Sequence, residues 1–308
     1  MRHFVPWILL CAGCATAASP PPADSPGDAA VVAVDAGVAP DGNVVVAADA
    51  AVVAADAAGV VADGPAAGAC GTAGAPTGVL RKNLTVDGKP RSYLLSVPAG
   101  YKGAAMPLVF AWHGLGGSGM FFRAAHGIEA PAQGAAIFVY PDALPLPSFG
   151  NATGWDLRPD GPDLHFFDAV LADVTGTYCV DRSRVFSMGH SFGGYMTNTL
   201  GCLRGAVLRA IAPVAGGLPM QTCMNKPLPA WLTHGSNDPV VAFAEGEAAR
   251  DHWRQLAACA ATTMMTEPAG CVAYDACTVP VHWCVHQRMH DWPPFASAAI
   301  WKFFSELK

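Results

Sequence analysis

The stretch "RVFSMGHSFGGYMTNTLGC", residues 184–202, decides the fold class of this chain. It places Gly189, Ser191 and Gly193 in the pattern Gly-x-Ser-x-Gly, after an apolar run typical of a buried strand and before a helical segment. In such a strand–turn–helix the serine hydroxyl stands above the sheet, and the small residues let the backbone turn without collision. The pentapeptide alone arises by chance in glycine-rich chains, so the elements around it must support the interpretation.

Strands and helices alternate on both sides of this stretch, which predicts an α/β domain over residues 78–308. Its sheet is expected to be mostly parallel, with helices on both faces. An antiparallel hairpin is expected at its N-terminal end, because Asp87-Gly88 joins two strand-like runs. The further strands are expected at 107–114, 135–141, 184–191, 208–216, 227–235 and 280–286, and the helices at 163–179, 192–202, 244–259 and 295–308.

A serine hydroxyl is a weak nucleophile until a base removes its proton, so a histidine and a carboxylate are needed later in the chain. Asp238 follows one predicted strand and His290 follows another, in the chain order Ser, Asp, His. Taken alone, Asp238 would equally well cap the next helix or form a turn. The other nearby histidines are interpreted as structural or packing residues: His190, His234, His282 and His286.

Two backbone N–H groups are candidates for an oxyanion hole, which stabilises the charge that develops on a reacting carbonyl oxygen. Phe192 begins the helix after Ser191, and Leu115 lies in the glycine-rich loop "HGLGG". Candidate substrate-lining side chains are His113, Trp155 and Trp292, with Trp112, Phe121 and Phe122 as further aromatic candidates. For Phe121 and Phe122 core packing is the favoured interpretation.

Residues 79–305 resemble the feruloyl esterase, acetylxylan esterase and polyhydroxybutyrate depolymerase-like proteins of carbohydrate esterase family one. The resemblance rests on "FAWHGLGGS" (110–118), "GWD" (154–156), the stretch around Ser191, "HGSNDPVV" (234–241) and "VHWCVHQRMHDWP" (281–293). It implies an α/β-hydrolase fold and a serine esterase that needs no metal or organic cofactor. It also implies the roles of Ser191 as nucleophile, Asp238 as the acid and His290 as the base.

One departure from the family pattern precedes His290. Where the family tends to carry glycines, this chain has Arg288 and Met289, which do not adopt positive φ easily. Either the loop takes another path, or the family's glycines need no unusual angles.

The resemblance implies an ester substrate, and its options include polymers: a feruloyl or acetyl ester of plant polysaccharide, or a polyhydroxyalkanoate polyester or oligomer. The alternatives are a weak or inactive surface-binding protein on a hydrolase fold, and a serine peptidase. A monomer is expected.

The first 18 residues are typical of an export signal, which places the protein outside the cell or in the periplasm. Ala15-Thr16-Ala17 suits ordinary cleavage, whereas Cys11-Ala12-Gly13-Cys14 resembles a lipoprotein processing site that would anchor Cys14 to the outer membrane. Both alternatives stay open. Residues 19–77, rich in Ala, Val, Asp and Pro, predict a flexible tether.

Charge and cysteine content narrow the function classes. Arg2 and seven aspartates in residues 1–80 account for the whole formal charge of −6, and no basic patch favours nucleic acid. Ten cysteines in an exported chain predict disulfides, with Cys70 in the tether as the candidate free thiol. No Cys-x-x-Cys pair follows the signal segment, which disfavours a zinc site.

Overall fold

The computed structural model describes residues 70–71, 74–219, 223 and 226–307. The chain divides into two units, Met1–Ala57 and Ala58–Lys308, and every described residue lies in the second. The predicted export signal, with Cys14, and most of the predicted tether at 19–77 lie outside the described residues. In the described part of the chain, no helix is both long and apolar enough to span a membrane.

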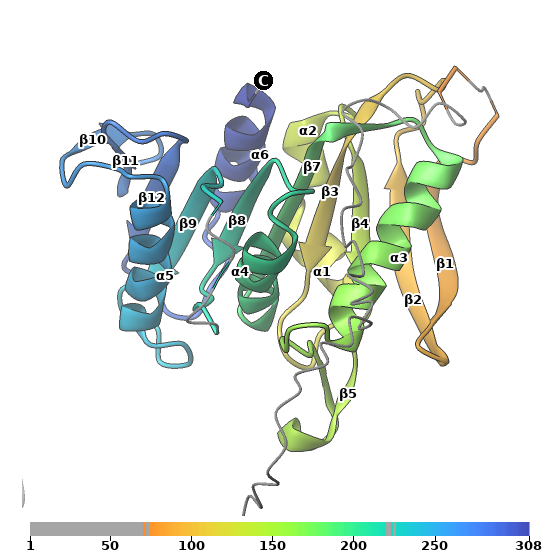
Figure 1. Cartoon of the computed structure of the whole chain (residues 1–308), viewed down its shortest axis with the longest axis horizontal. Helices are drawn as coiled ribbons and strands as arrows, with labels where there is room; N and C mark the ends of the chain where they lie inside the picture. Colours follow the sequence, from red (N-terminus) through yellow and green to blue (C-terminus); the bar gives the residue numbers. More distant parts are fainter. Residues whose placement is uncertain (1–69, 72–73, 220–222, 224–225, 308) are drawn as a thin grey trace, which may run out of the picture. The chain divides into compact units, whose positions relative to one another are not determined.

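Ten strands form one sheet in the order β1-β2-β4-β3-β7-β8-β9-β12-β11-β10 (Figure 1). Its centre is parallel and its two edges are antiparallel hairpins. This arrangement confirms the predicted mostly parallel sheet with an N-terminal hairpin. The central strands are β4 (Ile137–Pro141), β3 (Met106–Trp112), β7 (Val180–His190), β8 (Ala210–Val214), β9 (Ala230–Gly235) and β12 (Val281–His286). The edge strands are β1 (Gly78–Val86) and β2 (Lys89–Val97) at one side, and β11 (Cys271–Tyr274) and β10 (Thr263–Thr266) at the other.

Helices cover both faces of the sheet, and the central strands are therefore largely buried and mostly apolar. Every residue of β4, β8 and β9 is buried. Along β3 the side chains alternate, so that Phe110 and Trp112 pack on one face and Val109 and Ala111 on the other. The first face carries α3 (Pro162–Thr177), α4 (Phe192–Arg204) and α5 (Phe243–Leu256), and the second carries α1 (Gly119–His126), α2 (Glu129–Ala132) and α6 (Ala296–Glu306).

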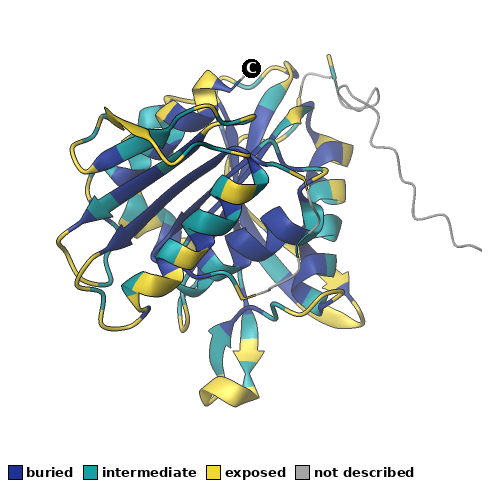
Figure 2. Cartoon of the chain, turned by 60° about the vertical axis from the view of Figure 1, so that its left-hand side comes forward, coloured by how far each residue is buried: buried dark blue, intermediate teal, exposed yellow. Residues whose placement is uncertain are grey.

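A short arm that the sequence did not predict extends from the sheet after β4. It consists of β5 (Leu144–Leu146), a 3-10 turn at Pro147–Phe149 and β6 (Ala152–Gly154). Figure 1 shows it below the domain at the label β5, and Figure 2 shows that its tip is exposed. The arm places Phe149 beside the end of the sheet where β7 meets α4, since its ring centroid lies 5.4 Å from that of Phe192.

Four disulfides join the described cysteines: Cys70–Cys179, Cys202–Cys223, Cys259–Cys277 and Cys271–Cys284. The prediction that Cys70 is a free thiol is therefore wrong. Cys70 bonds to the residue before β7, and the Tyr178 hydroxyl donates a hydrogen bond to the Pro76 carbonyl, so this segment is fastened to the domain. Because disulfides persist in oxidising compartments, the four bonds indicate an exported protein.

Candidate active site

Ser191 lies at a sharp turn between β7 and α4, in a backbone conformation that is rare for a residue with a side chain. Its φ is 59° and its ψ is −123°. A Cβ atom at Gly189 would lie 2.3 Å from the Gly193 carbonyl oxygen, and one at Gly193 would lie 1.9 Å from the Trp112 carbonyl oxygen. Only glycine fits at both positions, so the strand and helix can approach closely enough to present the serine at the edge of the sheet.

Asp238 and His290 form a hydrogen-bonded pair at the same edge. His290 Nδ1 lies 2.7 Å from Asp238 Oδ2, and the Asp238 side chain is fully buried. Its Oδ1 accepts hydrogen bonds from the backbone N–H groups of Val240 and Val241 at 2.8 and 2.9 Å. Burial by itself raises the pKa of Asp238, but the hydrogen bonds from His290 and these amides outweigh it and hold the pKa below its ordinary value. The ionised carboxylate fixes the proton on Nδ1 and leaves Nε2 of His290 free to act as a base.

The loops that carry this pair are joined directly. The Ser236 N–H donates to the His286 carbonyl at 2.8 Å, and the Asn237 amide donates to the Gln287 carbonyl at 2.8 Å. A Cβ at Gly235 would lie 2.3 Å from the Met289 carbonyl oxygen, so glycine there permits the close approach. Neither Met289 nor Arg288 has a positive φ. The loop before His290 therefore reaches Asp238 without the freedom of a glycine.

Ser191 and His290 line one hollow of about 350 Å³. Among the described residues, no hydrogen bond joins the serine hydroxyl to the imidazole, and such bonds often tighten only when substrate is bound. The structure thus brings Ser191, Asp238 and His290 to one edge of the sheet, with the acid–base pair already hydrogen-bonded.

The loop after β3 lies against the serine, as expected for an oxyanion loop. A Cβ at Gly114 would lie 3.2 Å from the Ser191 Cβ. The Gly116 N–H is used by the Thr153 carbonyl at 2.7 Å, whereas the N–H groups of Leu115 and Phe192 have no hydrogen-bond partner within the described chain. Two backbone donors are therefore free beside the serine.

His113 holds this loop in place. Its ring is buried, its Nδ1 donates to the Gly114 carbonyl at 2.7 Å, and its Nε2 accepts from the Ala143 N–H at 3.1 Å. Burial lowers the pKa of His113, which keeps the ring neutral so that one nitrogen accepts while the other donates. His113 borders the hollow, and its two hydrogen bonds fasten the loop after β3 to the segment after β4.

The predicted aromatic residues occupy different places. Trp292 borders the hollow and its ring stacks on that of His126, with centroids 4.5 Å apart. Trp155 is buried and its indole N–H donates to the His113 carbonyl at 2.7 Å, so it helps to hold the start of the loop after β3 in place. The core-packing interpretation is confirmed for Phe122, which is 2% exposed, and is wrong for Phe121, which is 66% exposed.

Comparison with known proteins identifies the group to which this site belongs. No family model matches the chain. Feruloyl esterase C of Emericella nidulans is 32% identical over 234 residues, a match that covers 70% of this chain and 83% of the relative. Feruloyl esterase D of Neurospora crassa is 31% identical over 255 residues, covering 72% and 84%. The chain belongs to the feruloyl esterase family. It is a carboxylic ester hydrolase, as predicted.

Solved structures confirm the fold of this esterase. The acetyl xylan esterase from Aspergillus awamori superposes with a TM-score of 0.59 at 14% identity, over 73% of this chain and 99% of that one. A ferulic acid esterase gives a TM-score of 0.55 at 16% identity, over 74% and 97%. At such identities the likeness shows the α/β-hydrolase fold alone.

The partly buried imidazole of His190, next to Ser191, is a feature of this esterase whose environment the sequence did not reveal. The ring centroid of His190 lies 4.9 Å from that of His290 and 5.8 Å from that of His126. Its Nε2 is buried without a hydrogen-bond partner among the described residues. Burial, and then the neighbouring His290, lower the pKa of His190 to about 3. His190 is therefore neutral in the folded protein at the pH values where unfolded histidine takes up a proton.

This burial predicts a specific acid sensitivity. Below pH 6.5 the unfolded chain binds a proton at His190 that the folded chain does not, so the free energy of unfolding falls as the pH drops toward about 3. His190→Gln removes this titration, and the slope of unfolding free energy against pH should decrease by about 1 kcal/mol per pH unit. Urea denaturation at several pH values between about 4 and 6 measures it. His165→Gln is the control, because neighbouring Asp160 and Asp87 raise the pKa of His165. Equal slopes for wild type and His190→Gln would contradict the prediction.

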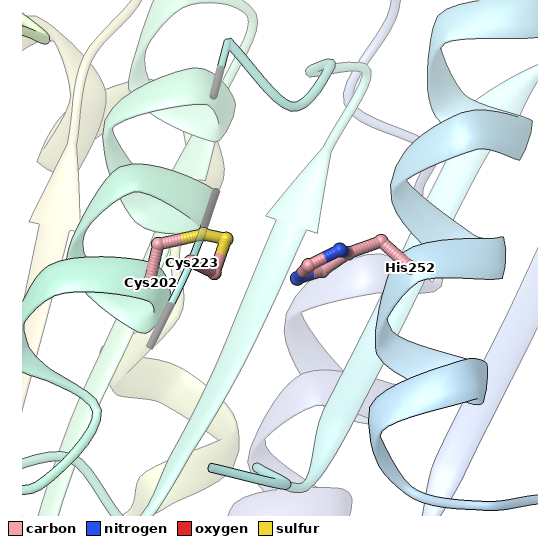
Figure 3. Close-up of side chains that lie close together, drawn as sticks. All are labelled: Cys202, Cys223 and His252. Carbon is pink, nitrogen blue, oxygen red and sulfur yellow. A yellow bond between two sulfur atoms is a disulfide. The ribbon is translucent and has the colours of Figure 1, made fainter. Parts of the chain in front are cut away.

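Three potential metal ligands lie together away from this site, within 4.8 Å of one another. They are Cys202 on α4, Cys223 in the loop after β8 and His252 on α5, whose ring faces the two sulfurs (Figure 3). The sulfurs are bonded to each other, and zinc needs cysteine as thiolate. While the disulfide is intact, only the His252 imidazole could bind a metal. One ligand does not make a zinc site, so these three residues are a disulfide with a neighbouring histidine.

Proposed function

We propose that this esterase hydrolyses hydroxycinnamoyl esters, of the kind attached to plant polysaccharide, through an acyl-enzyme on Ser191. The observation that carries the proposal is the buried Asp238–His290 pair beside a serine in a strained turn, all bordering one hollow. The relatives named feruloyl esterase support the choice of acyl group. The serine chemistry needs no metal and no organic cofactor.

The reaction follows from the positions of these groups. His290 Nε2 accepts the proton of the Ser191 hydroxyl as the serine oxygen attacks the ester carbonyl carbon. The free N–H groups of Phe192 and Leu115 donate hydrogen bonds to the carbonyl oxygen as it becomes negative. The protonated His290 then gives its proton to the leaving alcohol, and an acyl-enzyme remains. Water attacks this ester by the same route, with His290 again as base, and releases the acid.

The walls of the hollow suit a planar acyl group. Trp292, His126 and Phe122 border it, and their rings lie within 5.5 Å of one another by centroid. Apolar and aromatic walls with a few polar groups are usual for such sites, and a flat conjugated acid fills a space between rings better than acetate does. Trp292 is therefore proposed as a wall of the acyl site.

A substrate panel tests this proposal. The specificity constant kcat/KM for methyl ferulate should exceed that for an acetate ester of the same alcohol by about tenfold or more, because the aromatic walls contact only the larger acyl group. Acetylated xylan and polyhydroxybutyrate complete the panel, and a peptide substrate tests the peptidase alternative. Faster turnover of acetylated xylan, polyhydroxybutyrate or peptide than of methyl ferulate would overturn the proposal.

Export and attachment are part of the same proposal. The protein acts outside the cytoplasm as a monomer, carried by residues 1–18 as an export signal and 19–77 as a tether. The mass of the mature N-terminus separates the two processing routes, since a lipidated Cys14 and a free N-terminus after Ala17 or Ala18 differ in both length and mass.

A further inference from the structure

Exposed apolar side chains gather around the mouth of the candidate active site. In the described part of the chain, nine large apolar residues are exposed. Three of them lie on loops that carry the candidate catalytic groups, two lie on α1 and one lies on the β5–β6 arm. We call these six the apolar rim: Leu115, Met120, Phe121, Phe149, Val240 and Met289. Single exposed apolar residues are ordinary, whereas a group of them marks an interaction surface.

Each member of the rim is placed there by an element of the site. Leu115 and Phe121 border the hollow that contains Ser191, and Met120 precedes Phe121 in α1. Val240 follows the acid, to which its backbone N–H is hydrogen-bonded, and Met289 immediately precedes the base. Phe149 occupies the tip of the β5–β6 arm, close to the ring of Phe192. The rim therefore borders Ser191 next to the proposed oxyanion loop, next to the loops that carry Asp238 and His290, and next to the turn into α4.

A second hollow, of about 790 Å³, lies beside the arm. Phe192, the residue after Ser191, forms part of its lining. The other apolar side chains in the lining are Leu146, Pro147, Phe149, Trp155, Leu157, Pro159 and Pro219. Its polar residues are Ser148 and the pair Asp156–Arg158, whose charges satisfy each other. The apolar majority of the lining offers a hydrocarbon chain contacts that remove it from water.

Charged groups near the rim have ion-pair or hydrogen-bond partners. Arg288 lies 3.0 Å from Asp291, and Arg158 lies 2.5 Å from Asp156. The Glu245 carboxylate keeps its charge and accepts a hydrogen bond from the Tyr195 hydroxyl. An apolar surface that docks at the mouth therefore leaves each of these groups with a partner.

We propose that the apolar rim docks on the surface of water-insoluble ester aggregates, and that the esterase hydrolyses hydroxycinnamate esters of long-chain alcohols there. The alkyl chain occupies the hollow that Phe149 and Phe192 line, and the rim contacts the surrounding hydrocarbon. This inference rests on the proposed function for its acyl group and extends it to the alcohol. The bond broken is the same carboxylic ester, with water as the second reactant and the long-chain alcohol as the leaving group.

The test compares a soluble with an aggregating substrate. Methyl ferulate and dodecyl ferulate are assayed with wild type and with the rim variant Met120→Ser/Val240→Ser, whose two positions line neither the hollow that contains Ser191 nor the hollow proposed for the alkyl chain. The matched control is Met264→Ser/Met265→Ser, which changes two exposed apolar residues outside the rim, on β10.

The wild-type rate on dodecyl ferulate should rise by about tenfold as the substrate passes its aggregation limit, because docking concentrates enzyme at the surface. The control variant should keep this rise and the rim variant should lose it, while both hydrolyse methyl ferulate at the wild-type rate. A wild type without the rise, or a rim variant that retains it, overturns the inference. Failure of wild type on methyl ferulate would instead overturn the proposed acyl specificity.

A binding measurement removes the dependence on catalysis. Each protein is mixed with hexadecane droplets, and the fraction that partitions to the droplets is measured. The rim variant should partition about tenfold less than the control variant, because it has lost two apolar side chains that would leave water on docking. Equal partition of two folded variants, checked by circular dichroism, contradicts the docking surface.

Discussion

Replacing Ser191 by alanine should lower kcat for methyl ferulate by about 10⁵ to 10⁶, the range seen when a hydroxyl nucleophile of this kind is removed. The change deletes the only atom at this position that can form the acyl-enzyme, while His290, Asp238 and the two free N–H groups stay in place. Those groups still bind the ester and stabilise charge on its carbonyl, so the variant should hydrolyse it somewhat faster than water alone does. Ferulate release measured under substrate saturation gives the comparison.

A second serine of the same strand supplies the control. Ser183 lies near the other end of β7, where its hydroxyl donates to the Asp181 carboxylate, so Ser183→Ala should keep near-wild-type activity. The Ser191→Ala protein should also unfold at the wild-type temperature or above it, because alanine retains the Cβ in the strained turn and loses only a hydroxyl that has no hydrogen-bond partner among the described residues. Equal rates for Ser191→Ala and wild type would exclude the serine mechanism and favour the alternative of a protein that binds esters without hydrolysing them.

The features that the sequence predicted correctly are those set by local chemistry. Strands β4 and β8 are continuous apolar runs, which only a sheet covered on both faces buries completely. Gly189 and Gly193 were interpreted as small residues required by the turn, and both positions leave no room for a Cβ. The hydrogen-bonded Asp238–His290 pair follows from the same logic, because parallel strands β9 and β12 end at the same edge and deliver their loops together.

The features that it missed depend on contacts between distant segments. Cys70 pairs with Cys179 across 109 residues, and no spacing rule gives that partner. The strands of the β5–β6 arm are three residues long, too short for an alternating pattern to stand out. Phe121 and Phe122 are neighbours in α1, and a helix turns about 100° per residue, so the two rings point in different directions and only that of Phe122 is buried. Which of the two faces inward depends on how α1 is set against β3 and β4.

Asp238→Asn should lower kcat by about 10⁴ and leave the fold intact, because an amide in this position inverts the tautomer of His290. In the wild type, Oδ1 accepts from the N–H groups of Val240 and Val241, and Oδ2 accepts from His290 Nδ1. The single oxygen of asparagine is needed by the two backbone donors, so its NH₂ group faces Nδ1. Nδ1 must then accept, which puts the ring proton on Nε2 and leaves Ser191 without a base.

An aspartate next to His290 provides a control that separates a change of His290 tautomer from the loss of a negative charge. Asp291 adjoins His290 and pairs with Arg288 at 3.0 Å, so Asp291→Asn also removes a negative charge near the ring, but it leaves Nδ1 bonded to Asp238. It should reduce kcat by less than about threefold. The carboxylate of Asp238 also stabilises the wild-type fold above its ordinary pKa, since its pKa is lowered in the folded state, and that contribution is lost as the pH falls through the lowered value. The free energy of unfolding of Asp238→Asn should therefore depend less on pH in the acid range than that of wild type. An equal loss of kcat in Asp238→Asn and Asp291→Asn would count against the tautomer argument.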